Sequence, residues 1–249
     1  MTNLLQNKVA VITGANRGIG KCIVETFAEN GANIIVCMRS ISPETADWIK
    51  DLRGKFKISI NPVIVDLSDE KVVKAAIQEI FKISKKVDIL VNNAGIASGA
   101  LFQMTPVSEI RKIFEINFFS QIVLSQGIAK IMIRNKSGSI INLSSTAAFI
   151  ADPGTLAYGS SKAAFSRATQ SMASELGTYN IRVNAIAPSV TKTDMFEEMS
   201  YDARDKLINS SALKRAAEPK DIANVALFLA SGLSSFITGQ VIRVDGGIS

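Results

Sequence analysis

The amino-acid sequence predicts a single α/β domain built on a doubly wound parallel sheet, with helices on both faces. Short apolar segments alternate with amphipathic segments along the whole chain, which is the order expected of βαβ units. The short segments are apolar on both faces, as parallel strands covered by helices should be. No internal repeat, low-complexity tract or linker divides the chain, so residues 1–249 are predicted to form one domain.

Each element follows from its local pattern. Seven short apolar segments predict strands, at 9–13, 33–38, 58–65, 87–91, 139–143, 182–187 and 240–244. The amphipathic segments between them predict helices, at 18–30, 43–52, 69–84, 108–134, 158–179 and 219–230. Ser68-Asp69-Glu70 and Glu218-Pro219 mark two helix starts, with a capping residue or a first-turn proline. Segment 189–215 is long for a strand-to-helix connection, and it predicts a lid.

The composition argues against several classes of protein. Cys22 and Cys37 are the only cysteines, and the chain has no histidine. We therefore expect reduced thiols in a cytoplasmic protein and no metal site. The N-terminus lacks a signal-peptide core, and no apolar run approaches the roughly 20 residues of a membrane span.

The chain is basic, with a net charge of +6. A solvated basic surface accounts for this charge, and so does attraction to an anionic partner such as a phosphorylated cofactor or an acidic carrier protein. The Lys and Arg residues are spread along the chain without a basic block, so nucleic-acid binding is not expected.

A glycine cluster connects the first predicted strand to the first predicted helix. Gly14 permits a tight turn, and Gly18 and Gly20 let the backbone approach a pyrophosphate closely. The N-terminus of the following helix offers N–H groups and a partial positive charge to phosphates. At this position in a βαβ unit, the cluster predicts a dinucleotide site that includes Gly14, Asn16, Arg17, Gly18, Ile19 and Gly20.

The residues after the second predicted strand indicate which cofactor binds. A carboxylate at this point would hold a free ribose 2′-hydroxyl and favour NAD. This chain has Arg39-Ser40 instead. Arg39 could pair with a 2′-phosphate, and Arg17 could assist it. The sequence therefore favours NADP(H), with NAD(H) as the alternative.

Tyr158 and Lys162 are the strongest candidates for chemistry. They stand four residues apart, so a helix would place them on one face. A free tyrosine has a pKa of about 10, and a nearby fixed cation lowers it by favouring the phenolate. With no histidine in the chain, this pair and the upstream Ser145 predict a proton-transfer device.

The chain resembles the short-chain dehydrogenase/reductase family along its whole length. The matching motifs are Thr13–Gly20, Asn92-Asn-Ala-Gly95, Asn117, Ser145, Tyr158, Lys162 and the ending Thr238-Gly-Gln-Val-Ile-Arg-Val-Asp-Gly-Gly247. The resemblance implies a seven-stranded Rossmann sheet and hydride transfer between a nicotinamide and a carbonyl or alcohol. It also implies a homotetramer built from helices 108–134 and 158–179 and the C-terminal strand.

The resemblance assigns four catalytic roles. Tyr158 would protonate the carbonyl oxygen, and Ser145 would polarise that oxygen. Lys162 would lower the pKa of the tyrosine and bind the nicotinamide ribose. Asn117 would hold a water that links Lys162 to a proton relay.

The resemblance also assigns residues to the cofactor beyond the glycine cluster. Asp66 would contact the adenine, and Pro188, Val190 and Thr193 would cover the nicotinamide and approach the phosphates. The segment Asn93, Ala94 and Gly95 would shape the adenosine side, whereas Asn92 could mainly brace the central strands. One departure concerns Ser189, which stands where the family commonly has glycine after the proline.

Within the family, the chain is most similar to the 3-oxoacyl-(acyl-carrier-protein) reductases. This similarity implies an acyl-thioester substrate in fatty acid synthesis, and docking of an acyl carrier protein on a basic patch. Lys136 matches one basic position of that patch, but Tyr179 occupies the other. Either a substrate pocket or ordinary packing explains a set of apolar residues, namely Phe149, Ile150, Leu156, Met195 and Met199.

Two other functions stay open. A dehydrogenase acting on a sugar, a steroid or another small secondary alcohol would carry the same motifs. A nucleotide-sensing or scaffold protein could keep the fold without catalysis, although the intact catalytic set argues against that interpretation.

Overall fold

All seven strands form one parallel sheet. The computed structural model describes residues 3–248, except the side chain of Ala203. The strand order is β3-β2-β1-β4-β5-β6-β7, and every neighbouring pair is parallel. The bounds are β1 (Val9–Thr13), β2 (Asn33–Met38), β3 (Ile60–Ile64), β4 (Ile89–Asn92), β5 (Gly138–Leu143), β6 (Ile181–Pro188) and β7 (Val241–Val244). The predicted Rossmann fold is confirmed.

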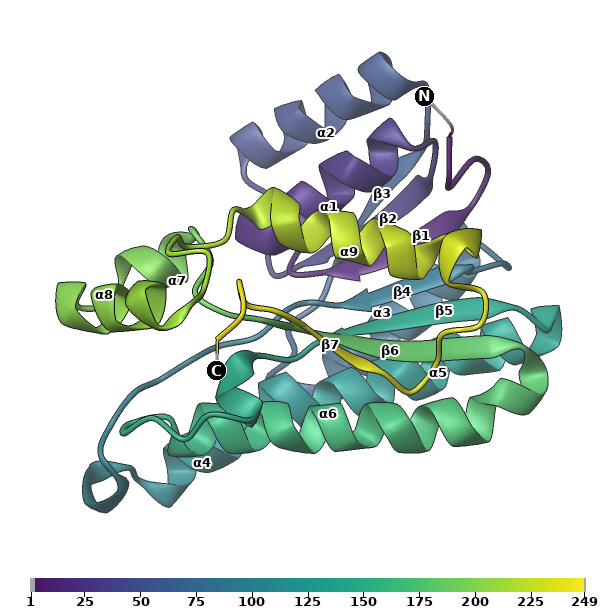
Figure 1. Cartoon of the computed structure of the whole chain (residues 1–249). Helices are drawn as coiled ribbons and strands as arrows, with labels where there is room; N and C mark the ends of the chain where they lie inside the picture. The colour runs from purple at the N-terminus through teal and green to yellow at the C-terminus, as the bar shows by residue number, and fades with distance from the viewer. Residues whose placement is uncertain (1–2, 249) are drawn as a thin grey trace.

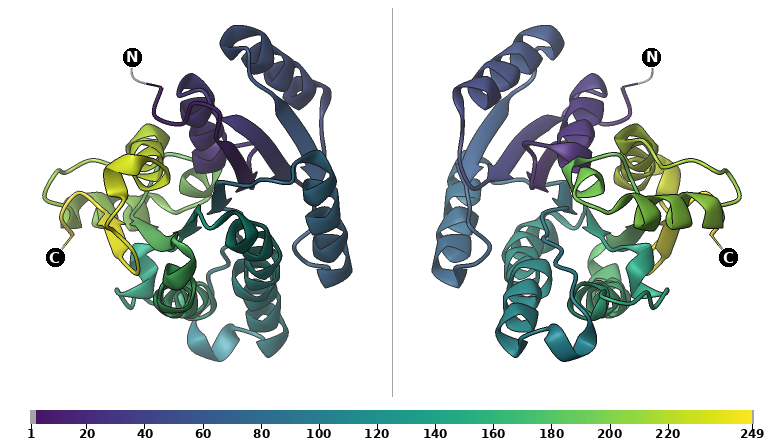
Figure 2. Two further views of the ribbon diagram at one scale, coloured as in Figure 1. Left: turned by 90° about the vertical axis from the view of Figure 1, so that its right-hand side faces the viewer. Right: turned by 90° about the vertical axis from the view of Figure 1, so that its left-hand side faces the viewer.

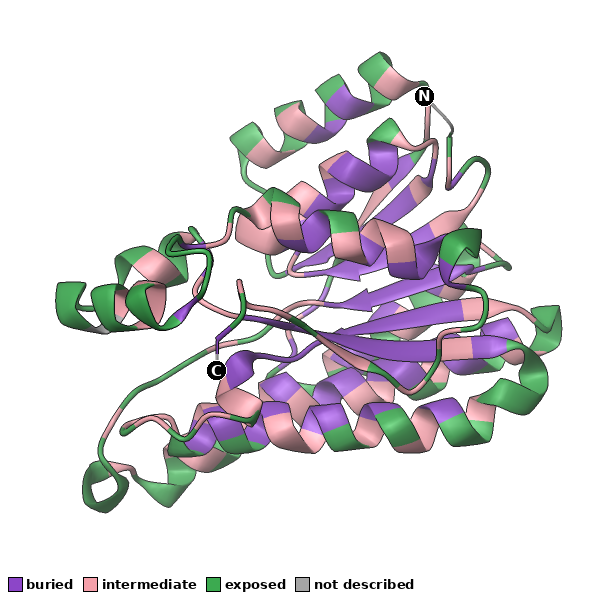
Figure 3. Cartoon of the chain, in the orientation of Figure 1, coloured by how far each residue is buried: buried purple, intermediate pink, exposed green. Residues whose placement is uncertain are grey.

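Helices cover both faces of the sheet (Figures 1 and 2). Helices α1, α2 and α9 pack on one face, and α3, α5 and α6 pack on the other. Side chains of β1 alternate between the two resulting cores, and the strands are buried between the layers (Figure 3). The bounds are α1 (Gly18–Glu29), α2 (Pro43–Phe56), α3 (Glu70–Ile83), α4 (Val107–Phe114), α5 (Ser120–Asn135), α6 (Leu156–Leu176) and α9 (Pro219–Ala230).

The helix predicted over 108–134 is not uniform. A π-helical turn, η2 (Glu115–Phe119), separates α4 from α5. Such turns often mark functional sites, and this one contains Asn117, which is fully buried. Since apolar residues keep nearly the same spacing through the turn, the sequence pattern alone did not reveal it.

The α4–α5 stretch has the length and composition of a membrane span. Across Val107–Asn135 the most apolar window has a mean hydropathy of 1.3, and half of that window is buried inside the domain. Its apolar side chains pack against α3 and the sheet. We therefore interpret it as a core helix of the domain.

The segment predicted as a lid contains two short helices, α7 (Asp194–Glu197) and α8 (Tyr201–Ser210). At its base, Thr191 forms an isolated parallel bridge with Ala217. The base of segment 189–215 is thus anchored next to the start of α9, while its helices extend beyond the sheet (Figure 1).

Among the described residues, two ion pairs connect the helices α7 and α8 to parts of the chain outside segment 189–215. Arg17 Nη1 lies 3.0 Å from Asp194 Oδ2, which ties α7 to the glycine loop. Lys206 Nζ lies 2.8 Å from Asp152 Oδ1, which ties α8 to the loop before α6. The lid therefore contacts both the predicted cofactor loop and the segment that precedes Tyr158.

Candidate active site

The glycine loop has the geometry of a phosphate cradle. Gly14 and Gly18 have φ angles of +63° and +53°, which L side chains rarely adopt. A Cβ added to Gly20 would lie 2.1 Å from the Gly14 carbonyl oxygen. Helix α1 begins after Arg17 without a side-chain cap, so its first-turn N–H groups remain available to an anion. These residues fit the pyrophosphate of a dinucleotide.

The close packing of Gly20 gives a test of this loop. Gly20→Ala should lower the free energy of unfolding by about 1–3 kcal/mol, because the added methyl overlaps backbone, and it should weaken NADPH binding. Urea unfolding and NADPH fluorescence titration measure the two effects. A Cβ at Gly54 in α2 meets nothing within 4 Å, so Gly54→Ala is the matched control. Unchanged stability and cofactor affinity in Gly20→Ala would contradict the cradle.

The segment after β4 braces the glycine loop. Asn93 Nδ2 donates to the carbonyl oxygens of Thr13 at 2.9 Å and Gly14 at 3.1 Å. Thr13 Oγ1 accepts from the backbone N–H groups of Asn93 and Ala94. Asn92 lies deeper and donates to side chains of α5 and β5. Asn92 thus braces the central strands, which was the alternative role considered for it.

Ser145, Tyr158 and Lys162 converge at the carboxyl end of β5. Ser145 precedes a short 3₁₀ turn, η3 (Thr146–Ala148), and its Oγ accepts from the Ala147 N–H at 3.1 Å. Tyr158 and Lys162 lie in the first two turns of α6, as their spacing predicts. Lys162 is 4% exposed, and its Nζ lies 5.8 Å from the centroid of the Tyr158 ring.

The pKa shifts of the pair differ from the sequence expectation. Burial raises the pKa of the Tyr158 phenol, and the Ser145 hydroxyl opposes this rise. Burial also lowers the pKa of the Lys162 ammonium to about 8. Lys162 Nζ donates to the Leu143 carbonyl at 2.7 Å. Among the chain's own groups, Ser145 lowers the tyrosine pKa, because Lys162 is directed toward a backbone carbonyl.

Both polar atoms of the Asn117 side-chain amide form hydrogen bonds. Its Oδ1 accepts from the Ile96 N–H at 2.9 Å, and its Nδ2 donates to the Ile96 carbonyl at 2.8 Å and to Ser161 Oγ at 3.2 Å. A Cβ on Gly95 would lie 3.2 Å from Asn117 Oδ1 and 3.4 Å from Lys162 Nζ. The side chain therefore fixes the loop after β4 against α6.

Comparisons with known proteins point to one family. The profile of the family described as enoyl-(acyl carrier protein) reductase matches residues 14–249. A 3α-hydroxysteroid dehydrogenase of Mediterraneibacter gnavus is 41% identical over 250 residues, which cover 99% of this chain and 98% of that protein. The chain belongs to the short-chain dehydrogenase/reductase family.

Relatives with two different substrates are similarly close. A 3-oxoacyl-(acyl-carrier-protein) reductase of Aquifex aeolicus is 35% identical over 245 residues, covering 98% of each chain. The structure of a 7α-hydroxysteroid dehydrogenase with NADH and 7-oxo glycochenodeoxycholic acid superposes with a TM-score of 0.92 at 37% identity, covering 99% of this chain and 96% of that one. This short-chain dehydrogenase/reductase therefore binds a nicotinamide cofactor and acts on a secondary alcohol or ketone.

The two arginines considered for cofactor choice have different surroundings in this short-chain dehydrogenase/reductase. Arg39 is exposed just after β2 and forms no ion pair with any described residue. Its charge helps to lower the pKa of Asp66, although hydrogen bonds from Ser68 contribute more. Arg17, in contrast, is paired with Asp194. Arg39 is therefore the better-placed group for a 2′-phosphate, with exposed Ser40 beside it.

An open hollow of about 510 Å³ is lined by the segment from Ala147 to Leu156, by the first two turns of α6 and by the loop after β4. Ser145 and Tyr158 do not line it, although both are close neighbours in sequence of residues that do. Phe149, Ile150 and Leu156 line it, which agrees with the pocket alternative considered for them. Met195 and Met199, in and just after α7, do not. Sequence reasoning missed Leu101 and Phe102, which line it from the loop after β4. Phe102 is 78% exposed, a sign that this wall is not ordinary core.

The remaining predicted cofactor residues lie at the same edge of the sheet. Pro188 ends β6, and Val190 accepts a backbone hydrogen bond from Ala217 at 3.0 Å. Thr193 lies over the glycine loop, because a Cβ on Gly18 would be 3.2 Å from its Cγ2. The family arrangement of the nicotinamide loop is thus sterically compatible with this chain.

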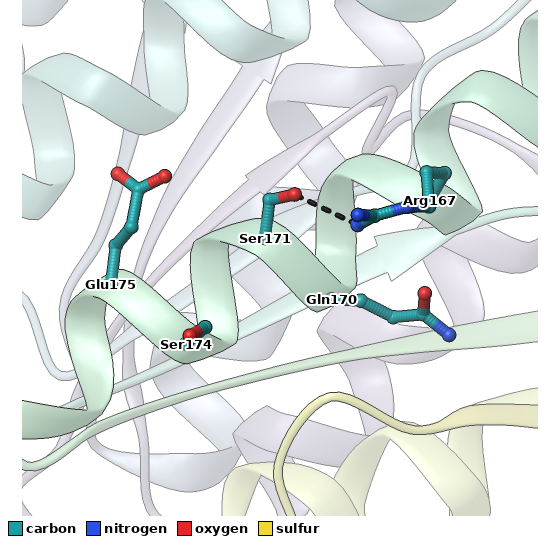
Figure 4. Close-up of a pocket in the computed structure, with 5 residues that line it drawn as sticks. All are labelled: Arg167, Gln170, Ser171, Ser174 and Glu175. Atoms are coloured by element: carbon teal, nitrogen blue, oxygen red, sulfur yellow. Dashed lines mark hydrogen bonds between the residues drawn. The ribbon is translucent and has the colours of Figure 1, made fainter.

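A second hollow, of about 440 Å³, lies on the outer face of α6 (Figure 4). One helix supplies its whole lining, which is polar: Arg167, Gln170, Ser171, Ser174 and Glu175. None of the predicted site residues lines it. We do not assign it to the substrate.

The predicted carrier-docking positions lie elsewhere. Lys136 follows α5, and Asn180 Nδ2 donates to its carbonyl oxygen at 3.3 Å, which places Tyr179 nearby. Both positions precede the strands β5 and β6. Ser145 and Tyr158 lie beyond the carboxyl ends of those strands. Within one protomer, the two positions are therefore adjacent but at the edge of the sheet opposite the catalytic set.

Proposed function

We propose that this enzyme reduces an apolar ketone to a secondary alcohol with NADPH, and that a 3-oxoacyl thioester is its preferred substrate. The hollow between the segment 147–156, the start of α6 and the loop after β4 carries the substrate part of the proposal. Its lining is mostly aromatic and aliphatic, which suits an acyl chain. Four polar side chains also line it, namely Gln103, Asp152, Thr155 and Ser160. The exposed Arg39, without an ion-pair partner among the described residues, supports NADPH as the cofactor.

In this proposal, the protein supplies the proton for the reduction and stabilises the carbonyl oxygen of the substrate. When bound, the nicotinamide supplies the hydride to the carbonyl carbon. Tyr158 donates its phenolic proton to the carbonyl oxygen, and the Ser145 hydroxyl hydrogen-bonds that oxygen as charge develops. Lys162, held by the Leu143 carbonyl, would bind the nicotinamide ribose, which is the other role that the family resemblance implies for it. Asn117 keeps the loop after β4 in place beside Lys162.

Arg39 should decide cofactor preference. Arg39→Asp removes a cation and places a carboxylate where a ribose 2′-hydroxyl can bond to it. We expect the dissociation constant of NADPH to rise at least about tenfold, which is ~1.4 kcal/mol, and that of NADH to fall or stay unchanged. Fluorescence titration of both cofactors measures the ratio. An equal change for the two cofactors would show that Arg39 does not face the 2′-phosphate.

A second candidate function is supported by the comparisons. Two hydroxysteroid dehydrogenases, at 41% and 39% identity, are at least as similar to this chain as the reductase from Aquifex aeolicus. A rigid apolar ring system would also suit the hollow. A catalytically silent scaffold has less support, since Asn117, Ser145, Tyr158 and Lys162 are all present and close together.

One assay separates the candidates. Initial rates with NADPH should be compared for acetoacetyl-CoA, a keto-steroid and a keto-sugar at equal concentrations. A thioester reductase should have its highest kcat/KM with acetoacetyl-CoA. Preference for the keto-steroid would replace the first proposal with the second, and cofactor binding without turnover of any carbonyl would favour the scaffold.

We also propose a cytoplasmic homotetramer. Exposed apolar side chains lie on two regions that the family uses for assembly, namely Phe119 in η2 and Phe236 before β7. Such exposure is typical of surfaces that pair in oligomers. In a tetramer, Lys136 of one protomer could approach the active site of another, which would reconcile its position with carrier docking. Light scattering after size-exclusion chromatography tests the assembly, and a monomer would refute it.

A further inference from the structure

The Ser189 hydroxyl is buried without a partner. Among the described residues, four buried side-chain polar atoms make no hydrogen bond: Asn92 Oδ1, Gln121 Oε1, Arg182 Nη1 and Ser189 Oγ. The Asn92, Gln121 and Arg182 side chains each bond through another atom. The hydroxyl of Ser189 has no other polar atom to compensate. A buried, unsatisfied group of this kind is costly, and it calls for an explanation.

Backbone requirements do not explain the serine. The Ser189 N–H donates to the Val244 carbonyl at 3.1 Å, and its own carbonyl accepts from Thr191 Oγ1 at 2.9 Å. The residue is not among those with positive φ, so a side chain fits here without strain. Both backbone groups are satisfied, so the hydroxyl is the one polar group of Ser189 that lacks a partner in the structure without ligand.

Ser189 lies at the reacting end of the site. The register of β5 and β6 pairs Leu143 with Ile186, and the Ser144 N–H donates to the Ile186 carbonyl at 2.7 Å. The strands therefore carry Ser145 and Ser189 to the same edge of the sheet. Ser189 also directly precedes Val190, in the segment predicted to cover the nicotinamide. Carbonyl oxygens of the reacting molecules are the acceptors to be expected at this edge.

We propose that the Ser189 hydroxyl donates a hydrogen bond to a carbonyl oxygen of the bound reactants. Two carbonyls fit this chemistry. One is the carboxamide of the nicotinamide, and the other is the second carbonyl of a β-keto substrate. The proposal rests on the nicotinamide-dependent activity and, for its substrate arm, on the proposed thioester. The glycine that the family commonly has in this position would lack the bond.

Ser189→Ala, Ser189→Gly and Ser189→Thr test the proposal, with Ser174→Ala on the exposed face of α6 as the matched control. Without ligand, Ser189→Ala should be at least as stable to heat as the wild type, since it removes an unsatisfied group. With ligand, Ala and Gly should weaken binding about three- to tenfold, the worth of one neutral hydrogen bond. Thr should restore it.

Three titrations identify the acceptor. If it is the carboxamide, the dissociation constants of NADPH and NADH rise together, whereas that of adenosine 2′,5′-bisphosphate stays constant. If it is the second carbonyl, KM rises for acetoacetyl-CoA but not for a simple ketone. NADH carries the same carboxamide as NADPH. The carboxamide test can therefore still be made with NADH if the enzyme does not prefer NADPH. Loss of thermal stability in Ser189→Ala, or unchanged constants in every titration, would overturn the proposal.

Discussion

Replacing Tyr158 with phenylalanine should lower kcat for ketone reduction by about 10²- to 10⁴-fold, the range for loss of a general acid. Phenylalanine keeps the ring but removes the phenol, and the chain has no histidine that could take over the proton. NADPH affinity should change by no more than about tenfold, since at most one neutral hydrogen bond is at stake. Steady-state rates and fluorescence titration measure the two effects.

The matched control for this variant is Tyr179→Phe. Tyr179 lies in the short turn after α6 and is largely exposed, so its replacement should leave both kcat and affinity unchanged. If Tyr158→Phe keeps more than about a tenth of the wild-type kcat, another group supplies the proton. The roles of Ser145 and Lys162 would then need revision as well.

Lys162→Met should abolish most activity and also change the pH dependence of stability. Lys162 is 4% exposed, and burial lowers its pKa from 10.5 to about 8. Below pH 8 Lys162 is protonated in the folded wild type, so burial of its ammonium lowers the unfolding free energy by the full amount. Between about pH 8 and 10.5 only the unfolded chain holds this proton, so stability contributed by this group rises with pH. The pKa shift corresponds to a change of about 3 kcal/mol in the unfolding free energy over this pH range.

Methionine has a similar length and carries no proton, so this rise should be absent from the variant. The difference in unfolding free energy, variant minus wild type, should therefore be larger at pH 7 than at pH 10. Urea unfolding at the two pH values measures it, and comparison of the two proteins cancels the other titrating groups. A difference that does not vary with pH would show that Lys162 is not desolvated. A variant with near-wild-type kcat would exclude its catalytic role.

The local sequence patterns predicted most of the fold. Parallel strands and the glycine loop depend on apolar runs and on residues such as Gly14 and Gly18, whose backbone conformations are local properties. Helix ends were less well predicted. The helix expected over 43–52 continues to Phe56, because Lys57 ends it in the left-handed conformation. No residue type in the sequence marks that end as a glycine would.

Interactions between distant segments could not be predicted from the sequence. Arg17 and Asp194 are 177 residues apart, and no sequence pattern near Arg17 predicts this ion pair. The effect of burial on Lys162 likewise depends on how α6 packs against β5. The position of Phe102 at the hollow also depends on tertiary packing, and no local pattern around this residue indicates it. The role of Tyr158 could be predicted from the spacing of nearby residues. The shape of the substrate site could not, because distant segments of the chain form it.

We propose that this chain transfers hydride from NADPH to an apolar ketone with Tyr158 as the acid. The most direct measurement follows loss of the absorbance of reduced nicotinamide upon mixing the purified wild type, NADPH and acetoacetyl-CoA, with Tyr158→Phe in parallel. We expect steady consumption with the wild type and almost none with the variant. No consumption by the wild type with acetoacetyl-CoA, a keto-steroid or a keto-sugar, or equal consumption by the two proteins, would contradict it.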